Sequence, residues 1–487
     1  MGEFTTPALI ALLMLFPVTA FAVWAKRPPI AVLYVVFFAT LFGPEGAFIK
    51  LPAVPPLDKH SLPYLFLFVV ALVRWRPALA RAHIGRGVDL LLVVAVVAGF
   101  ITWQTNTDAL RYGSWRTHEV QGLIFNDGLQ YGVSALLSVF LPFLLGRAFF
   151  RSRRDVVDLL KFLGASALVQ TLFLLVEIRL SPQWHTWVYG YGAHLDFLQT
   201  MRWGGYRPMN FMAHGLALSL FMCVAMLGAA VLAKRDDTVY RWPAKRVALG
   251  LFVIVVICKS TGSIMYAAAF GALIAFASPV AQVRTAFAVA CFVAIYPMLR
   301  AFDWFPAEGL VEQATAAFGE DRAQSLEFRF DNELVLLEKA RERLWFGWGG
   351  FGRASVYSAD DGRESSIADG HWIIVLGIHG VVGFVTRFGP LLIPVLLAAL
   401  RLARFRFPAD RTLVAGLTVI CAVLALDLIP NGLFATYPYV LAGALLGVLQ
   451  ESARKGGAWS KEPAPARVRG RRRVSTPDPR AASARPS

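Results

Sequence analysis

Cysteine and charge are both scarce in this chain of 487 residues. Its four cysteines stand at unrelated positions inside apolar segments, which predicts neither a disulfide framework nor a zinc site. We interpret them as small buried residues. They are Cys223, Cys258, Cys291 and Cys421. Only 16% of the residues are charged, and the 48 basic residues outnumber the 32 acidic ones.

Long apolar runs dominate what remains. Hydrophobic residues make up 57% of the sequence, in runs separated by short basic or Pro/Gly-rich segments. This pattern predicts an all-α, polytopic transmembrane helical bundle of about 12 to 14 spans. The expected spans lie near residues 8–25, 30–43, 62–74, 88–103, 128–146, 157–179, 210–233, 246–258, 261–278, 283–299, 371–400, 411–429 and 432–450. No basic residue precedes the first run and no clear cleavage site follows it, so we interpret it as a span rather than a signal peptide.

Lysine and arginine concentrate in alternate connecting segments, and this bias orients the chain. Because short cytoplasmic loops retain positive charge, we expect a cytoplasmic C-terminus and an outward-facing long loop. The predicted regions are 1–299 (N-terminal transmembrane helices), 300–370 (a periplasmic loop), 371–450 (C-terminal transmembrane helices) and 451–487 (a disordered basic cytoplasmic tail). The basic segments are explained by orientation and contact with anionic membrane lipid, so no nucleic acid partner is expected.

Aromatic and basic residues gather in the outward segment 180–210. Arg202 and Arg207 stand near the start of a span, on the side where topology does not favour basic residues. Aromatic rings suit the C–H faces of sugars, and guanidinium groups suit phosphate oxygens. The alternative for the aromatic residues is an interfacial belt. They are Trp184, Trp187, Tyr189, Tyr191, Trp203 and Tyr206.

The outward segment 300–370 contains one clear helical pattern. Apolar residues recur at spacings of three, four and seven, which predicts an amphipathic helix lying against the membrane domain. The apolar stripe consists of Leu326, Phe330, Leu334, Leu337 and Leu344. Arg329 lies off this stripe, one turn before Glu333. A surface ion pair between these two residues is the alternative to a functional role for Arg329.

A glycine-rich stretch, GWGGFG at residues 347–352, follows this helix and matches G-x-G-x-x-G. No strand precedes the glycines and no βαβ unit obviously follows, so we reject a dinucleotide site. We expect a tight turn that brings the backbone close to a ligand or to the membrane domain.

Two titratable residues, Asp369 and His371, stand where the next apolar run begins, in the sequence ESSIADGHWIIVLGIHGVVGF. A charged group placed deeper in the bilayer would cost several kcal/mol. Asp369 is therefore either the N-cap of a helix or a residue that takes part in chemistry. His371 is either an interfacial residue or a competing proton acceptor.

Four of these pieces, in this order, resemble the bacterial O-antigen ligase and polysaccharide polymerase family of integral membrane glycosyltransferases. The resemblance covers about residues 200–385 and consists of MRWGGYRPMN, KSTGS, RFDNELVLLEKARERLWFGWGGFG and DGHWIIVLGIHGVVG. It implies a GT-C-type enzyme of the bacterial inner membrane. Such an enzyme joins undecaprenyl-diphosphate-linked glycan units at the periplasmic face by an inverting transfer that needs no metal and no cofactor.

The resemblance also implies roles for single residues. The expected substrate-binding residues are Arg202, Arg207, Lys259 and Arg329. Their cationic groups would neutralise the charge that develops on the diphosphate leaving group. Asp369 or His371 would accept the proton of the acceptor hydroxyl.

Two departures from the family pattern bear on these roles. Asp369 occupies the position where the return motif usually has His or Asp, and the ligase-type His-Asn is absent. This favours a polymerase over a ligase that transfers glycan to lipid A core. Ile264 stands where the family often has Arg, so Lys259 is the expected source of that charge. Polysaccharide export or chain-length proteins are possible partners.

Two rival functions come from other classes. A flippase or transporter of lipid-linked sugars often shows internal repeats and polar groups near the midplane of the bilayer. No repeat is found, and the polar groups inside the expected spans are few. They are mainly Glu177, His214, Arg387 and Asp427. The second rival is a scaffold protein of an envelope complex, for which segment 300–370 would be a docking surface.

Overall fold

The computed structural model describes residues 5–454 and residue 459, except residues 53, 81, 83, 195 and 434. The predicted disordered tail, 451–487, lies almost wholly outside the described residues. The described part is mostly helical, and its strands form antiparallel pairs of two to three residues each.

The elements follow one another in a simple order. Up to residue 206 they are α1 Thr6–Ala25, α2 Pro28–Phe42, β1 Phe48–Ile49, β2 Leu57–Asp58, α3 Leu62–Arg74, α4 Arg76–Ala80, η1 Gly87–Asp89, α5 Leu90–Gln104, β3 Leu110–Tyr112, β4 His118–Val120, α6 Phe125–Ala135, η2 Leu136–Phe140, α7 Leu141–Phe149, α8 Arg153–Leu180, α9 Trp184–Tyr189, η3 Phe197–Thr200, β5 Met201–Arg202 and β6 Gly205–Tyr206. The remainder are α10 Gly215–Ala233, β7 Thr238–Val239, β8 Trp242–Pro243, α11 Ala244–Ile257, α12 Thr261–Phe276, α13 Pro279–Ala301, α14 Ala307–Phe318, α15 Glu320–Arg341, α16 His371–Arg401, η4 Leu402–Arg404, α17 Pro408–Asp427 and α18 Tyr437–Arg454.

Eight stretches of helix in the described part are long and apolar enough to cross a membrane. They are Thr6–Ala25, Gly87–Gln104, Phe125–Phe149, Arg153–Leu180, Gly215–Ala233, Pro279–Ala301, His371–Arg404 and Pro408–Asp427. The chain is therefore a multi-pass helical membrane protein, as expected. Three further apolar helices, α2, α3 and α12, have only 13 to 16 residues. The expected total of about 13 spans stays a prediction.

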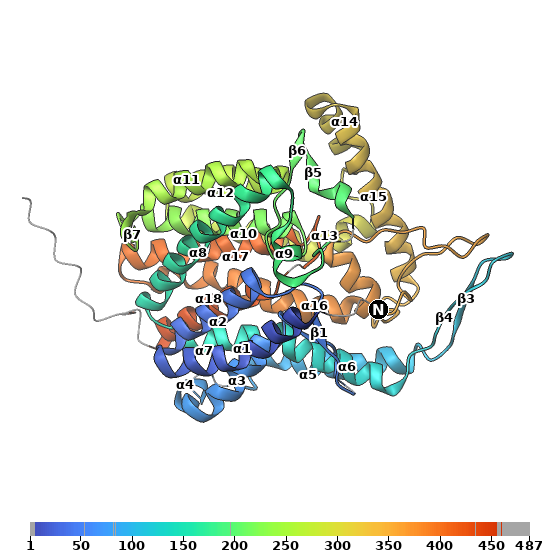
Figure 1. Cartoon of the computed structure of the whole chain (residues 1–487), viewed down its shortest axis with the longest axis horizontal. Coiled ribbons are helices and arrows are strands. Elements are labelled where there is room, and N and C mark those ends of the chain that lie inside the picture. The colour runs from blue at the N-terminus through green and yellow to red at the C-terminus, as the bar shows by residue number, and fades with distance from the viewer. Residues whose placement is uncertain are drawn as a thin grey trace, which may run out of the picture.

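Helices of the bundle run side by side, and α14 and α15 stand together at one end (Figure 1). The β5–β6 hairpin lies beside these two helices, and the β3–β4 hairpin extends from the same end (Figure 1). This end carries segment 300–370, which the charge bias predicts to face outward. We call it the outward end.

Helix α10 lies at the centre of the bundle, where nearly all its side chains are buried. Nearby, glycines allow α7 and α18 to approach closely. A Cβ atom at Gly443 would lie 2.1 Å from the carbonyl oxygen of Phe143, and one at Gly447 would lie 2.6 Å from that of Arg147. Small residues four apart commonly allow such backbone contact in membranes.

Helix α16 is broken at Gly380, which corrects the single continuous span expected over 371–400. Gly380 has φ +66° and ψ −167°, which are not helical values. The rings of His371 and Phe388 lie 5.7 Å apart, whereas an unbroken helix would separate these residues by about 25 Å along its axis. The first part of α16 therefore folds back against the second.

The glycine-rich turn packs on this break. The backbone N–H of Trp348 donates to the Gly377 carbonyl at 2.8 Å, and that of Gly349 donates to the Ile378 carbonyl at 2.9 Å. A Cβ atom at Gly380 would lie 2.4 Å from the backbone carbon of Trp345, so only glycine fits this contact and this φ. The expectation of a tight turn against the membrane domain is confirmed.

Helix α15 confirms the expected amphipathic helix, with one correction to its buried face. Leu336 and Leu337 are buried against the bundle, whereas Leu334 and Leu344 are exposed. Glu333 is buried where the apolar stripe predicted Leu334, because its carboxylate lies 3.2 Å from the buried guanidinium of Arg300. Apolar spacing alone could not show this, since the decisive residue is charged.

Candidate functional site

Three of the expected substrate-binding residues meet at the outward end. The ammonium group of Lys259 donates to the carbonyl oxygen of Arg202 at 3.1 Å. The guanidinium group of Arg207 donates to the carbonyl oxygen of Lys259 at 3.2 Å. Lys259 connects α11 to α12 in a left-handed conformation, with φ +56°. The structure therefore joins the motifs MRWGGYRPMN and KSTGS directly.

Two glycines make room for these side chains. A Cβ atom at Gly205 would lie 2.6 Å from the Lys259 ammonium nitrogen. One at Gly215 would lie 2.3 Å from Cδ of Arg207. Glycine at both positions lets the two cationic side chains cross the backbone of neighbouring elements.

Glu177, near the end of α8, anchors the segment that carries Arg202 and Arg207. Its buried carboxylate accepts hydrogen bonds from the backbone N–H groups of four residues, at 2.7 to 3.1 Å. These donors are Gln183, Trp184, Met209 and Asn210. The carboxylate thus fixes both ends of the loop, which gives this polar residue of a span a structural role.

Arg329 and Asp369 form an ion pair, although 40 positions separate them in the sequence. The Nε of Arg329 lies 3.1 Å from the carboxylate of Asp369, and both side chains are partly open to solvent. The alternative prediction, a surface ion pair between Arg329 and Glu333, is wrong, because Glu333 contacts Arg300 and the hydroxyl of Tyr296 instead. Arg300 lies on the other side of Glu333, inside the bundle, and its charge offsets the burial of that carboxylate.

The two groups of cations lie near each other. Burial, together with the positive charges of Arg202 and Arg329, lowers the pKa of Arg207 to about 10. Burial and the neighbouring positive charges, that of Arg207 first among them, lower the pKa of His214 to about 4. We call Arg202, Arg207, Lys259, Arg329 and Asp369 the outward cluster. It contains four cations and a single carboxylate, so it is suited to an anion of more than one charge.

A small cavity of about 70 Å³ adjoins the outward cluster. Arg329 and Asp369 lie on its wall together with apolar side chains such as Phe328, Ile367 and Ile373. A ligand at this position would meet an ion pair on one side and an apolar surface on the other. Sugar rings have both kinds of surface.

His371 is not part of the outward cluster. Its ring packs on Phe388, and its buried Nε2 has no hydrogen-bond partner among the described residues. Asp369 is not the N-cap of α16 either, because Gly370 holds that position and makes no side-chain cap. The motif position favoured Asp369 over His371 as the proton acceptor, and the structure places the two side chains in different surroundings.

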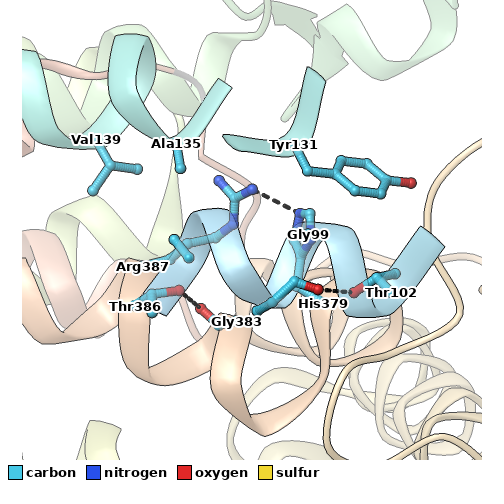
Figure 2. Close-up of a pocket in the computed structure, with 11 residues that line it drawn as sticks. Gly99, Thr102, Tyr131, Ala135, Val139, His379, Gly383, Thr386 and Arg387 are labelled. Atoms are coloured by element: carbon cyan, nitrogen blue, oxygen red, sulfur yellow. Dashed lines mark hydrogen bonds between the residues drawn. The ribbon is translucent and has the colours of Figure 1, made fainter. Parts of the chain in front are cut away.

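A second polar cluster lies inside the bundle, between α16, α5 and α6. The guanidinium group of Arg387 lies 2.7 Å from Nε2 of His379. A cavity of about 20 Å³ adjoins them, with Thr102 and Tyr131 on its wall (Figure 2). The sequence indicated Arg387, but His379 was missed because only the fold-back of α16 gives it a polar partner.

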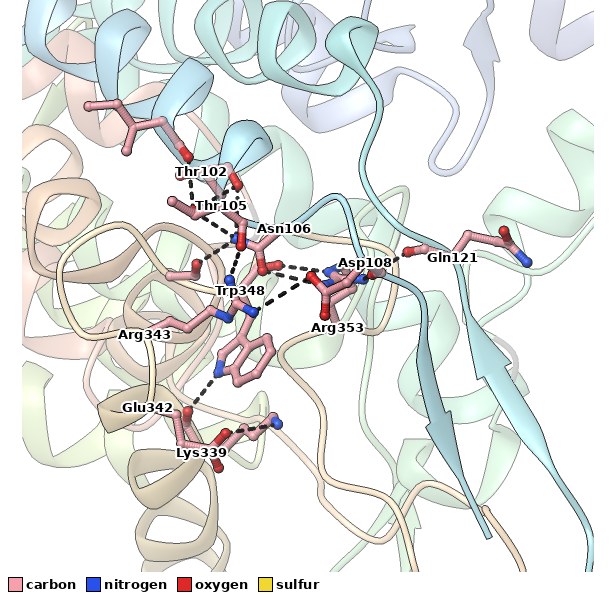
Figure 3. Close-up of polar contacts among 12 residues, drawn as sticks. Thr102, Thr105, Asn106, Asp108, Gln121, Lys339, Glu342, Arg343, Trp348 and Arg353 are labelled. Atoms are coloured by element: carbon pink, nitrogen blue, oxygen red, sulfur yellow. Dashed lines mark hydrogen bonds and ion pairs between the residues drawn. The ribbon is translucent and has the colours of Figure 1, made fainter.

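A third polar network, also unforeseen, joins the end of α5 to the loop after α15 (Figure 3). The fully buried guanidinium of Arg353 donates to the carbonyl oxygens of Asp108, Gln121 and Trp348 at 2.7 to 3.2 Å. The ammonium group of Lys339 lies 3.7 Å from the ring centre of Trp348. Because these donors bind protein groups, we interpret the network as structural.

No family model matches the chain, and neither does any curated protein. Within the residues that the structure describes, no group of three or more His, Cys, Asp or Glu side chains could hold a metal ion.

Proposed function

We propose that the chain is an inner-membrane glycosyltransferase that joins undecaprenyl-diphosphate-linked glycan units at the periplasmic face, as an O-antigen or exopolysaccharide polymerase. The observation that carries this proposal is the outward cluster. Four cations from three separate segments lie near one another, and one of them, Arg329, pairs with the carboxylate of Asp369 beside a cavity with a partly apolar wall. A lipid-linked glycosyl diphosphate combines a sugar, a diphosphate anion and a membrane anchor, which matches an apolar and polar cavity, a group of cations and a membrane-spanning bundle.

The chemistry divides between the cations and Asp369. The oxygen of an acceptor sugar hydroxyl attacks the anomeric carbon of the donor, and the bond from that carbon to the diphosphate oxygen breaks. The diphosphate leaves with the electron pair, and Arg202, Arg207 and Lys259 stabilise its added negative charge. The hydroxyl proton passes to the carboxylate of Asp369, which Arg329 holds in place.

One observation favours a second function, a transporter of lipid-linked sugars. Arg387 lies within a candidate span and has His379 as its hydrogen-bond partner. Charged side chains at such depth often mark a transport path. The polymerase remains the better proposal, because the larger gathering of cations is at the outward end and includes a carboxylate able to accept a proton.

The experiment uses the purified full-length chain in liposomes with undecaprenyl-diphosphate-linked repeat units from the producing bacterium. A ladder of products longer than one repeat supports the polymerase. Arg207→Ala should reduce product formation by a factor of about 100 or more, and Arg207→Lys should restore part of it, because ammonium keeps the charge but loses the bidentate geometry.

Arg363→Ala is the matched control, because Arg363 is a solvent-exposed arginine at the outward end and pairs only with Asp361 within the described part. It should leave the ladder unchanged. Movement of the lipid-linked sugar across the bilayer without any longer product would overturn the polymerase in favour of the transporter. Transfer to added lipid A core alone would identify a ligase.

A further inference from the structure

An apolar groove with a cationic rim lies at the end of α16 away from Asp369. It runs between η1, α16 and α18 and has a volume of about 400 Å³. Leu91, Ile393 and Leu397 are among its apolar walls. Three arginines line it as well: Arg86, Arg147 and Arg401.

These arginines leave an excess of positive charge. The side chain of Arg147 is 1% exposed and lies 2.6 Å from the carboxylate of Asp89, yet its buried Nε has no hydrogen-bond partner among the residues that the structure describes. The guanidinium groups of Arg86 and Arg401 form no hydrogen bond or ion pair within the part of the chain that the structure describes. Among the described residues, the carboxylate of Asp89 is therefore the one anionic partner of these three arginines.

We propose that this groove binds one anionic glycerophospholipid. Its phosphate lies between Arg86 and Arg401, and an acyl chain lies along Leu91, Ile393 and Leu397. Basic pockets between transmembrane helices suit lipid head groups, and guanidinium groups suit phosphate oxygens. The unmatched charge selects a head group with net negative charge over a zwitterionic one. This site is independent of the proposed glycosyl transfer, because it shares no residue with the outward cluster.

Native mass spectrometry of the purified full-length chain tests the site. Phosphatidylglycerol is titrated against phosphatidylcholine with the same acyl chains, and inorganic phosphate is titrated separately. The unmodified protein should bind one phosphatidylglycerol molecule in preference to phosphatidylcholine. The double variant Arg86→Gln with Arg401→Gln should bind it about 30-fold more weakly, because each basic group near an anionic lipid contributes about a fivefold gain in affinity and the two contributions multiply.

A matched control removes the same charge elsewhere on this end of the protein. Arg241 and Arg404 are exposed and do not line the groove. The double variant Arg241→Gln with Arg404→Gln should keep the affinity for phosphatidylglycerol within about twofold. Leu397→Trp keeps every charge but fills the groove, and it should lose the bound lipid.

Four outcomes would overturn the proposal. They are equal binding of the two lipids, unchanged binding in the Arg86/Arg401 double variant, an equal loss in the Arg241/Arg404 control, and unchanged binding in Leu397→Trp. A fifth outcome, displacement of the lipid by millimolar inorganic phosphate, would also overturn the proposal, because it would assign the arginines to a soluble anion. Glycosyl transfer can succeed or fail in any of these cases, so the two proposals are tested separately.

Discussion

Asp369 precedes a helix, but its carboxylate is held by Arg329 rather than by the helix end. Asp369→Asn keeps the size of the side chain and removes its charge and its ability to accept a proton. We expect this variant to lose a factor of about 100 or more in product formation in the liposome assay, at every pH. Asp331→Asn is the control, because Asp331 is an exposed carboxylate on the same helix as Arg329. Normal polymer from Asp369→Asn would remove Asp369 from the chemistry.

We expect His214 to make the stability of the fold depend on pH. Its ring nitrogen accepts a hydrogen bond from the backbone of Leu216 at the start of α10, and burial and nearby cations lower its pKa from 6.5 to about 4. Between these two values the unfolded chain binds more protons than the folded one. The contribution of His214 is therefore complete above pH 6.5 and is lost as the pH falls towards 4.

His214→Asn should flatten this dependence, because Asn can cap a helix but does not titrate. The measurement is the midpoint of thermal unfolding in detergent from pH 4 to pH 7. His118→Asn, in the exposed strand β4, should keep the slope of the unmodified protein. A slope that is the same in His214→Asn would show that other groups cause the pH dependence.

At the scale of elements, the fold-back of α16 brings together residues that a continuous helix would hold apart. In a background with the four native cysteines replaced, His371→Cys with Phe388→Cys should form a disulfide on mild oxidation, because the two native rings lie 5.7 Å apart. His371→Cys with Arg401→Cys is the control and should stay reduced. Electrophoretic mobility with and without reductant reports the result. Failure of the first pair to form a disulfide would contradict the fold-back and support an unbroken helix.

The positions of the helices could be predicted from apolar runs far better than the breaks within them. Most expected spans have a helix within a few residues of the predicted bounds, since burial in lipid demands apolar residues. Gly380 lies in a run that reads as continuous, and its break depends on the distant backbone of Trp345. The ion pair of Arg329 with Asp369 was likewise hidden, although each residue was chosen separately. Long-range packing decides such contacts, and no local pattern records it.

At the scale of the whole molecule, we expect the outward cluster and the anionic-lipid groove to lie on opposite sides of the membrane. Helix α16 connects them, since Asp369 lies two residues before its first residue and Arg401 ends it. The positive-inside rule predicts that the lipid groove is cytoplasmic and the cluster periplasmic. A glycan polymerase needs this orientation, because its substrate is presented outside the cytoplasm.

Labelling of single cysteines in intact cells tests that orientation. In the cysteine-free background, Arg363→Cys at the outward end should react with a thiol reagent that cannot cross the inner membrane. Arg241→Cys, between β7 and β8, should react only after the cells are lysed. Both residues are exposed, so access to solvent does not distinguish them. Reaction of Arg241→Cys alone in intact cells would place the outward cluster in the wrong compartment and contradict the polymerase. Reaction of both would leave the cluster outside but contradict the orientation inferred from the charge bias. The lipid groove would keep its charge and shape in either case.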